Sequence, residues 1–193
     1  MRYRNVIHTP LMAALLLGGS AAFADVTPAD VWGEWKSQMA GFGYEISAKE
    51  SLSGPDLTIS DLSMRIAVPE ENGSVDVTLS GMTFQDNGDG TVSVKLPSIL
   101  PIGIHVATDD VGPLDVTVNY TTTGLAMVAS GAPGDLTYTY SAASMGMALA
   151  EMVAKGTVVD PGEISLSLRN ISGSASTSGT DLRTSKQDFR AEN

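Results

Sequence analysis

The chain contains no cysteine, which excludes disulfide bonds, thiol catalysis and the lipid-bearing cysteine of a bacterial lipoprotein. Histidine is almost absent as well: His8 and His105 are the two in the sequence, so no histidine cluster can hold a metal. No G-x-S-x-G motif occurs, and no glycine-rich loop carries the P-loop lysine. Nucleophilic hydrolysis therefore has no visible apparatus, and we expect neither a cofactor nor a metal.

Basic residues are scarce. The chain has 11 Lys plus Arg against 22 Asp plus Glu, a formal net charge of −11. This balance disfavours binding to nucleic acid or to an anionic membrane. A surplus of acid that keeps an exported protein soluble is the favoured explanation, and an acidic recognition surface is the alternative.

The first 24 residues have the pattern of a cleavable secretory signal. Arg2 and Arg4 give a positively charged start, and residues 11–17 form a short apolar run. Ala22-Phe23-Ala24 matches an A-x-A cleavage site. The apolar run is shorter than the roughly 20 residues of a membrane span, which argues against an uncleaved anchor. We therefore predict cleavage after Ala24 and a periplasmic or secreted protein without a transmembrane span.

A helix is predicted over residues 28–43. Thr27 suits the N-cap, Pro28 suits the first helical position, and Asp30 can close a capping box. Apolar residues then recur at intervals of three and four. These are Val31, Trp32, Trp35, Met39 and Phe42. Packing of this stripe on a sheet is the favoured interpretation, and an aromatic face that grips a ligand is the alternative.

From residue 44 onward, apolar residues alternate with polar ones, as in an antiparallel sheet with one apolar and one wet face. The alternation slips near Asp61, which predicts a β-bulge, and Gly81 resets it again. Residues 86–90, Asp-Asn-Gly-Asp-Gly, predict a hairpin turn. We therefore predict a mainly β fold: an antiparallel, bulged and curved sheet (open groove, sandwich or partial barrel) with one N-terminal amphipathic helix after a signal peptide.

The β-rich domain is predicted over residues 25–173. Residues 145–153 are compatible with a strand or a helix, and the alternation of Met145, Met147 and Leu149 favours a strand. After Ile171 the chain becomes rich in Ser, Thr and Gly and then charged. Residues 174–193 are therefore predicted to form a poorly ordered or truncated tail.

The candidate functional residues are apolar, because no reactive constellation is present. As a lone histidine in a strand-like run, His105 is expected to be structural. A possible apolar contact surface comprises Trp32, Trp35, Met39, Met145 and Met147.

Four segments carry a resemblance to a known family: DVWGEWKSQMAGFGYEIS, DLTISDLSMRI, FQDNGDGTVSVKLP and GLAMVASGAPGDLTYTYSA. The chain resembles the DUF2125 family of exported alphaproteobacterial proteins over residues 30–173. The likeness rests on a pattern of strands and turns, not on a catalytic motif. It implies export, and it implies no activity or site residues, because the family has none assigned.

Three classes of function remain. The first is a non-enzymatic envelope protein whose sheet offers an apolar face or groove to a lipid-like ligand or an envelope protein. The second is a purely structural or adhesive exported module. The third, an outer-membrane barrel fragment, is disfavoured because both tryptophans lie in the helix and the strands lack aromatic girdles. Oligomeric state is not indicated by the sequence.

Overall fold

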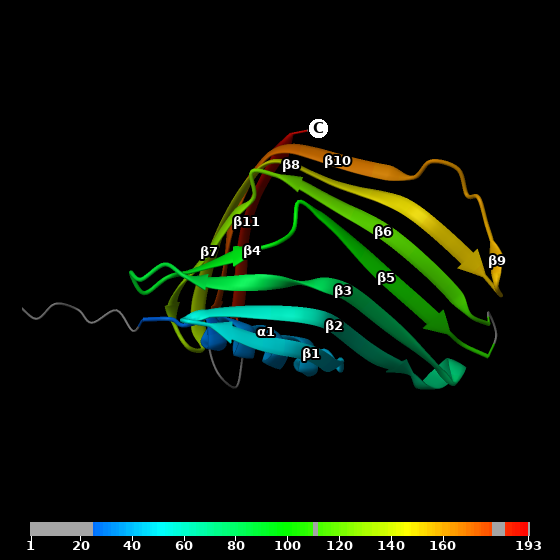
Figure 1. The fold of residues 1–193 in the computed structure, drawn as a ribbon, viewed down its shortest axis with the longest axis horizontal. Coiled ribbons are helices and arrows are strands. Elements are labelled where there is room, and N and C mark those ends of the chain that lie inside the picture. Colours follow the sequence, from blue (N-terminus) through cyan, green and yellow to red (C-terminus); the bar gives the residue numbers. More distant parts are fainter. Residues whose placement is uncertain (1–24, 110–111, 179–183, 193) are drawn as a thin grey trace, which may run out of the picture.

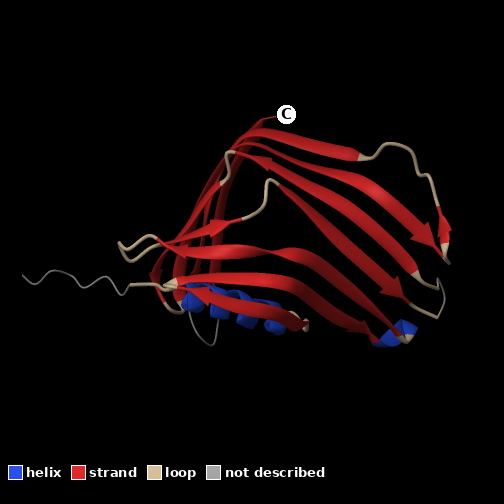
Figure 2. Ribbon diagram, in the orientation of Figure 1, coloured by secondary structure: helices blue, strands red, loops and turns tan. Residues whose placement is uncertain are grey.

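The computed structural model describes residues 25–109, 112–178 and 184–192. The predicted signal segment lies outside the described residues. The described part consists of one α-helix, one short 3-10 helix and antiparallel strands that form a single curved sheet (Figures 1 and 2). No helix among these residues is long and apolar enough to cross a membrane. The elements are α1 Pro28–Gly41, β1 Glu45–Ser53, β2 Asp56–Val68, η1 Pro69–Glu71, β3 Gly73–Asp86, β4 Val92–Lys95, β5 Ile99–Ala107, β6 Leu114–Thr123, β7 Ala126–Ala132, β8 Asp135–Ala154, β9 Thr157–Val158, β10 Ser165–Ser178 and β11 Thr184–Glu192.

The sheet is a meander in which each long strand pairs with the next one along the chain. Strand β3 pairs with β4 near one end and with β5 near the other. Strand β8 likewise pairs with β7 and then with β6, while β4 pairs with β7 and β5 with β6. Strands β4 and β5 therefore lie end to end in the position next to β3, and β7 and β6 lie end to end in the position next to β8. The predicted antiparallel, bulged and curved sheet is confirmed, and among the described residues the outer strands β1 and β11 do not pair with each other.

Helix α1 begins as the sequence predicts. The side chain of Thr27 accepts the N–H of Asp30 at 3.2 Å, and the Asp30 carboxylate accepts the N–H of Thr27 at 3.0 Å. This reciprocal capping box satisfies two backbone donors that the first turn would otherwise leave unpaired. Pro28 occupies the first turn, and the helix ends at Gly41.

A crease crosses the sheet where the alternation of apolar and polar residues slips. Asp61 in β2 and Gly81 in β3 have positive φ values of 50° and 142°, and Asn170 in β10 has 49°. At the same height along the neighbouring strands, residues 96–98 separate β4 from β5, and Gly124 lies between β6 and β7. We call the part of the sheet that packs on α1 the helix half, and the part beyond the crease the open half. The predicted bulge at Asp61 and the reset at Gly81 are confirmed.

The core lies in the helix half, between α1 and the sheet. The ring of Phe84 lies 6.0 Å from that of Trp32 and 5.3 Å from that of Trp35, the latter in an edge-to-face arrangement. Such aromatic pairs add to the stabilisation from burial. The buried cluster comprises Val26, Val31, Trp32, Leu57, Ile59, Leu62, Met82, Phe84, Val92, Val94, Ala129 and Leu136.

Two predictions about the second half of the chain have opposite outcomes. Residues 145–153 are strand, as predicted, within β8. In the range predicted to form a poorly ordered or truncated tail, residues 174–193, the described residues instead lie in strands: β10 continues to Ser178, and β11 pairs with it along most of its length. Ser- and Thr-rich segments can form strands because the ladder bonds are made by the backbone, and Gly173 leaves room for the side chain of Tyr140.

Candidate ligand-binding face

The open half is apolar on one face. Residues that pair directly across antiparallel strands lie on the same face, so the register identifies the members of each face. Leu79 of β3 pairs with Leu62 of β2 and Ile102 of β5. The same row continues through Val118 to Leu149. We call this surface the apolar face; it comprises Leu62, Met64, Ile66, Val75, Val77, Leu79, Leu100, Ile102, Ile104, Val106, Leu114, Val116, Val118, Tyr120, Met145, Met147, Leu149, Met152, Leu166 and Leu168.

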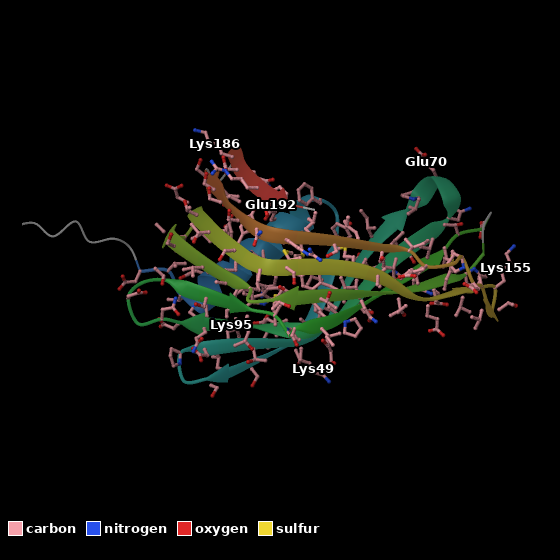
Figure 3. The ribbon with its side chains drawn as sticks, turned by 90° about the horizontal axis from the view of Figure 1, so that it is seen from above. Lys49, Glu70, Lys95, Lys155, Lys186 and Glu192 are labelled. Carbon is pink, nitrogen blue, oxygen red and sulfur yellow. The ribbon has the colours of Figure 1, made fainter. Side chains whose placement is uncertain are left out.

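The opposite face of the same strands is polar. Arg65 lies 3.7 Å from the carboxylate of Asp76, and that carboxylate accepts the hydroxyl of Ser74 at 3.3 Å. In the next strands, Nδ1 of His105 lies 2.6 Å from Oδ1 of Asp115. These charged side chains therefore lie on the face opposite the apolar one. Figure 3 shows the side chains of the sheet from above.

The apolar face lies on the same side of the sheet as α1. Leu62 belongs to the buried core, and Met64 and Leu79 pack against that core. Helix α1 packs on β1, β2 and β3, yet the indole N–H of Trp35 also donates to the hydroxyl of Tyr138 in β8 at 3.0 Å. Because β8 is separated from β3 in the sheet order by β4 and β7, the sheet must curve around the helix (Figure 1). The apolar face is therefore concave.

Helix α1 packs in the helix half, mainly on β1 to β3. In the open half, large apolar side chains at β8 and β10 reach solvent: Met147 is 47% exposed, Leu166 58%, and Ile164, which directly precedes β10, 56%. Exposed apolar side chains that are contiguous with one another commonly mark a binding surface.

A small hollow lies in this uncovered region. Its volume is about 100 Å³, and it is lined by Tyr120, Met145, Gly146, Met147, Leu166 and Leu168. Tyr120 pairs with Met147, which pairs with Leu166, so three strands supply one row of side chains. Burial raises the pKa of the Tyr120 phenol, and its hydrogen bond with Thr122 opposes this shift only in part. Tyr120 itself is buried, with 7% of its surface exposed.

The five predicted contact residues fall in two separate places. Trp32 is buried in the core and Trp35 packs beside it, while Met39 is half-buried on α1. The prediction that the tryptophan side of the helix packs on the sheet is confirmed. Met145 and Met147 lie together in the hollow. The sequence did not identify Tyr120, Leu166 and Leu168 as their neighbours, because alternation alone does not reveal which strands pair.

No group of three or more His, Asp or Glu residues that could hold a metal occurs in the part of the chain that the structure describes. The pair of His105 and Asp115 lies on the polar face, with Thr117 and Thr78 at the edge of the same shallow depression. His105 is thus paired with a carboxylate on the adjacent strand.

No family model, no curated protein and no solved structure matches this chain.

Proposed function

We propose that this protein is a non-enzymatic, exported envelope protein that holds a lipid-like ligand against the apolar face of its open half. The observation that carries the proposal is the hollow on the concave surface, which three strands line and where the apolar side chains of Met147 and Leu166 are about half exposed.

An aliphatic chain is the occupant that this surface suits best. The lining offers aliphatic and methionine side chains, and an acyl chain makes no demand for hydrogen bonds. Methionine adapts to ligands of varied shape because its side chain is unbranched and polarisable. From Leu114 to Tyr120 the face extends roughly 20 Å along one strand, at about 3.3 Å per residue. A lipid chain could lie along this length.

The proposed location supports the same function. Export follows from the predicted signal over residues 1–24, and the DUF2125 resemblance implies the same compartment. In an aqueous periplasm, an apolar molecule needs a protein surface to cover it. The excess of acid would keep such a carrier soluble and away from anionic membranes.

Native mass spectrometry of protein purified from the periplasm tests the proposal. We expect an adduct of lipid mass that organic extraction removes, and we expect the extracted protein to bind a fatty acid that carries an environment-sensitive fluorophore. Near-ultraviolet circular dichroism must show intact tertiary packing, because loosely packed states also bind apolar dyes.

Failure of both measurements on well-folded protein would contradict lipid binding. A purely structural or adhesive exported module would then be the better proposal. Reproducible turnover in a hydrolase screen, abolished by substitution of one Asp, Glu or His105, would contradict the non-enzymatic assignment.

A further inference from the structure

Strand β3 lacks a neighbouring strand on one side where it crosses the crease. Strand β4 pairs with β3 from Thr83 onward, and β5 pairs with it only as far as Leu79. Residues 80–82 therefore have a strand neighbour only on the β2 side. On the other side, residues 96–98 connect β4 to β5. The resulting gap lies inside the sheet, and described residues bound it on both sides.

A shallow hollow of about 350 Å³ lies at this gap, and we call it the crease pocket. Leu57 and Phe84 belong to the buried core, so their neighbours Thr58 and Thr83 project from the opposite face of the sheet. The crease pocket therefore opens on the polar face. The side chains that give it its chemistry are Thr58, Ser60, Ser80, Thr83, Lys95 and Pro97.

Lys95 supplies the positive charge of the crease pocket. Its side chain is exposed (Figure 3), and no described residue forms an ion pair with it. Lys49 lies opposite Ser60, but its ammonium is only 2.7 Å from the carboxylate of Asp61, which neutralises it. The described residues that line the pocket include no Asp or Glu. In a chain of formal charge −11, the pocket is thus a local site of positive charge that favours an anion.

Hydroxyl groups lie around this ammonium. Thr83 lies directly opposite Lys95 in the sheet, and its Oγ1 is 3.4 Å from Oγ1 of Thr58. Ser60 and Ser80 add two more hydroxyls to the lining. Each hydroxyl can donate one hydrogen bond and accept others. Such a set suits a ligand that itself carries several hydroxyl groups.

An apolar wall completes the crease pocket. Leu96 packs against the buried core, and the exposed Pro97 follows it in the connection from β4 to β5. The C–H groups of a sugar ring can pack on such a wall while the hydroxyls of the ring bond at its edges. A bare phosphate would leave the wall unused, and a peptide could form few ladder bonds along residues 80–82. The combination of charge, hydroxyls and wall favours an acidic sugar.

We propose that the crease pocket binds an acidic saccharide, whose sugar unit carries a carboxylate. The carboxylate pairs with the ammonium of Lys95, the sugar hydroxyls bond to Thr58, Ser60 and Thr83, and the ring packs on Pro97. The proposal is independent of lipid binding, because the crease pocket lies on the opposite face of the sheet from the apolar face.

Isothermal titration calorimetry with three probes tests the proposal. The probes are trigalacturonate, the neutral trisaccharide maltotriose, and inorganic phosphate. We expect saturable binding of trigalacturonate, at least tenfold tighter than that of either other probe. Amide NMR signals of Gly81, Thr83 and Lys95 should shift when trigalacturonate binds. Absence of trigalacturonate binding, or phosphate binding of equal strength, would overturn the proposal.

Matched variants separate this pocket from general attraction between charges. Lys95→Gln should weaken trigalacturonate binding at least tenfold. Lys155→Gln removes an exposed lysine directly after β8, far from the crease, and should bind as the wild type does. Thr83→Val removes one hydroxyl and keeps the side-chain shape, and it should also weaken binding. Urea unfolding verifies that each variant is folded. Equal affinities of the Lys95→Gln and Lys155→Gln variants would overturn the proposal.

Discussion

The indole N–H of Trp32 donates a hydrogen bond of 2.7 Å to Oε1 of Glu50, and the same oxygen lies 2.8 Å from Nζ of Lys36. That ammonium also lies 5.3 Å from the centre of the Trp32 ring. The buried indole of α1 is therefore tied to β1 through a carboxylate at the surface.

The link predicts a dependence of stability on pH. The hydrogen bonds from Lys36 and then from Trp32 hold the pKa of Glu50 below its ordinary value. The ionised carboxylate therefore stabilises the folded state above the unfolded pKa of about 4.3, and this contribution is lost as the pH falls through the lower folded pKa. Glu50→Gln should lower the free energy of unfolding near neutral pH, and the difference from wild type should shrink in acid.

Urea unfolding at a series of pH values measures this difference. Glu45→Gln is a matched control, because Glu45 is an exposed residue of the same strand. A constant difference between the wild type and Glu50→Gln from neutral pH into acid would contradict the assigned role of the carboxylate.

A second prediction concerns Trp35. Its ring meets Phe84 edge to face, and its N–H bonds to the Tyr138 hydroxyl on β8. Trp35→Ala should cost about 3–5 kcal/mol in the free energy of unfolding, the range for emptying a large aromatic site. Gln38→Ala, at an exposed position of the same helix, should change it by less than about 0.5 kcal/mol. Urea unfolding of both variants measures the difference. Equal unfolding midpoints for the two variants would show that the indole contributes little to the stability of the core.

A third prediction addresses the crease. A Cβ added to Gly81, which has a φ of 142°, would overlap the carbonyl oxygen of Ile59 in the neighbouring strand. Gly88 also has a positive φ, 74°, but lies in open space. Gly88→Ala should therefore cost about 1 kcal/mol for backbone strain alone, and Gly81→Ala about 3 kcal/mol or more. Thermal unfolding of both variants measures the difference. Similar losses of stability in the two variants would contradict a close approach of the two strands at the crease.

Local patterns in the sequence predict most elements of this fold, but not how they pair. The capping residues Thr27 and Asp30 define the start of the helix, and the slips at Asp61 and Gly81 are visible as breaks in a period of two. What the sequence does not reveal is that these slips align across neighbouring strands to form one crease, because each slip is local and strand pairing is not.

The errors have the same origin. Residues 174–193 have few apolar side chains to bury, yet a backbone ladder along β10 and β11 needs few large side chains. Met145 and Met147 are identified as contact residues from their alternation. Their neighbours Tyr120 and Leu166 come from strands that are distant in the sequence, and only the register brings them together.

The last prediction tests the hollow itself. Met147 and Leu166 are 47% and 58% exposed, so replacing both with glutamine removes apolar contact area at little cost to folding. Binding of the fluorescent fatty acid should weaken at least tenfold, because loss of a few buried methylenes at about 0.8 kcal/mol each exceeds the 1.4 kcal/mol of a tenfold change. The control replaces Leu52 and Ile99, which are 72% and 60% exposed on β1 and β5, with glutamine. If the control pair weakens binding as much, the fatty acid adheres to apolar surface in general, and the hollow is not its site.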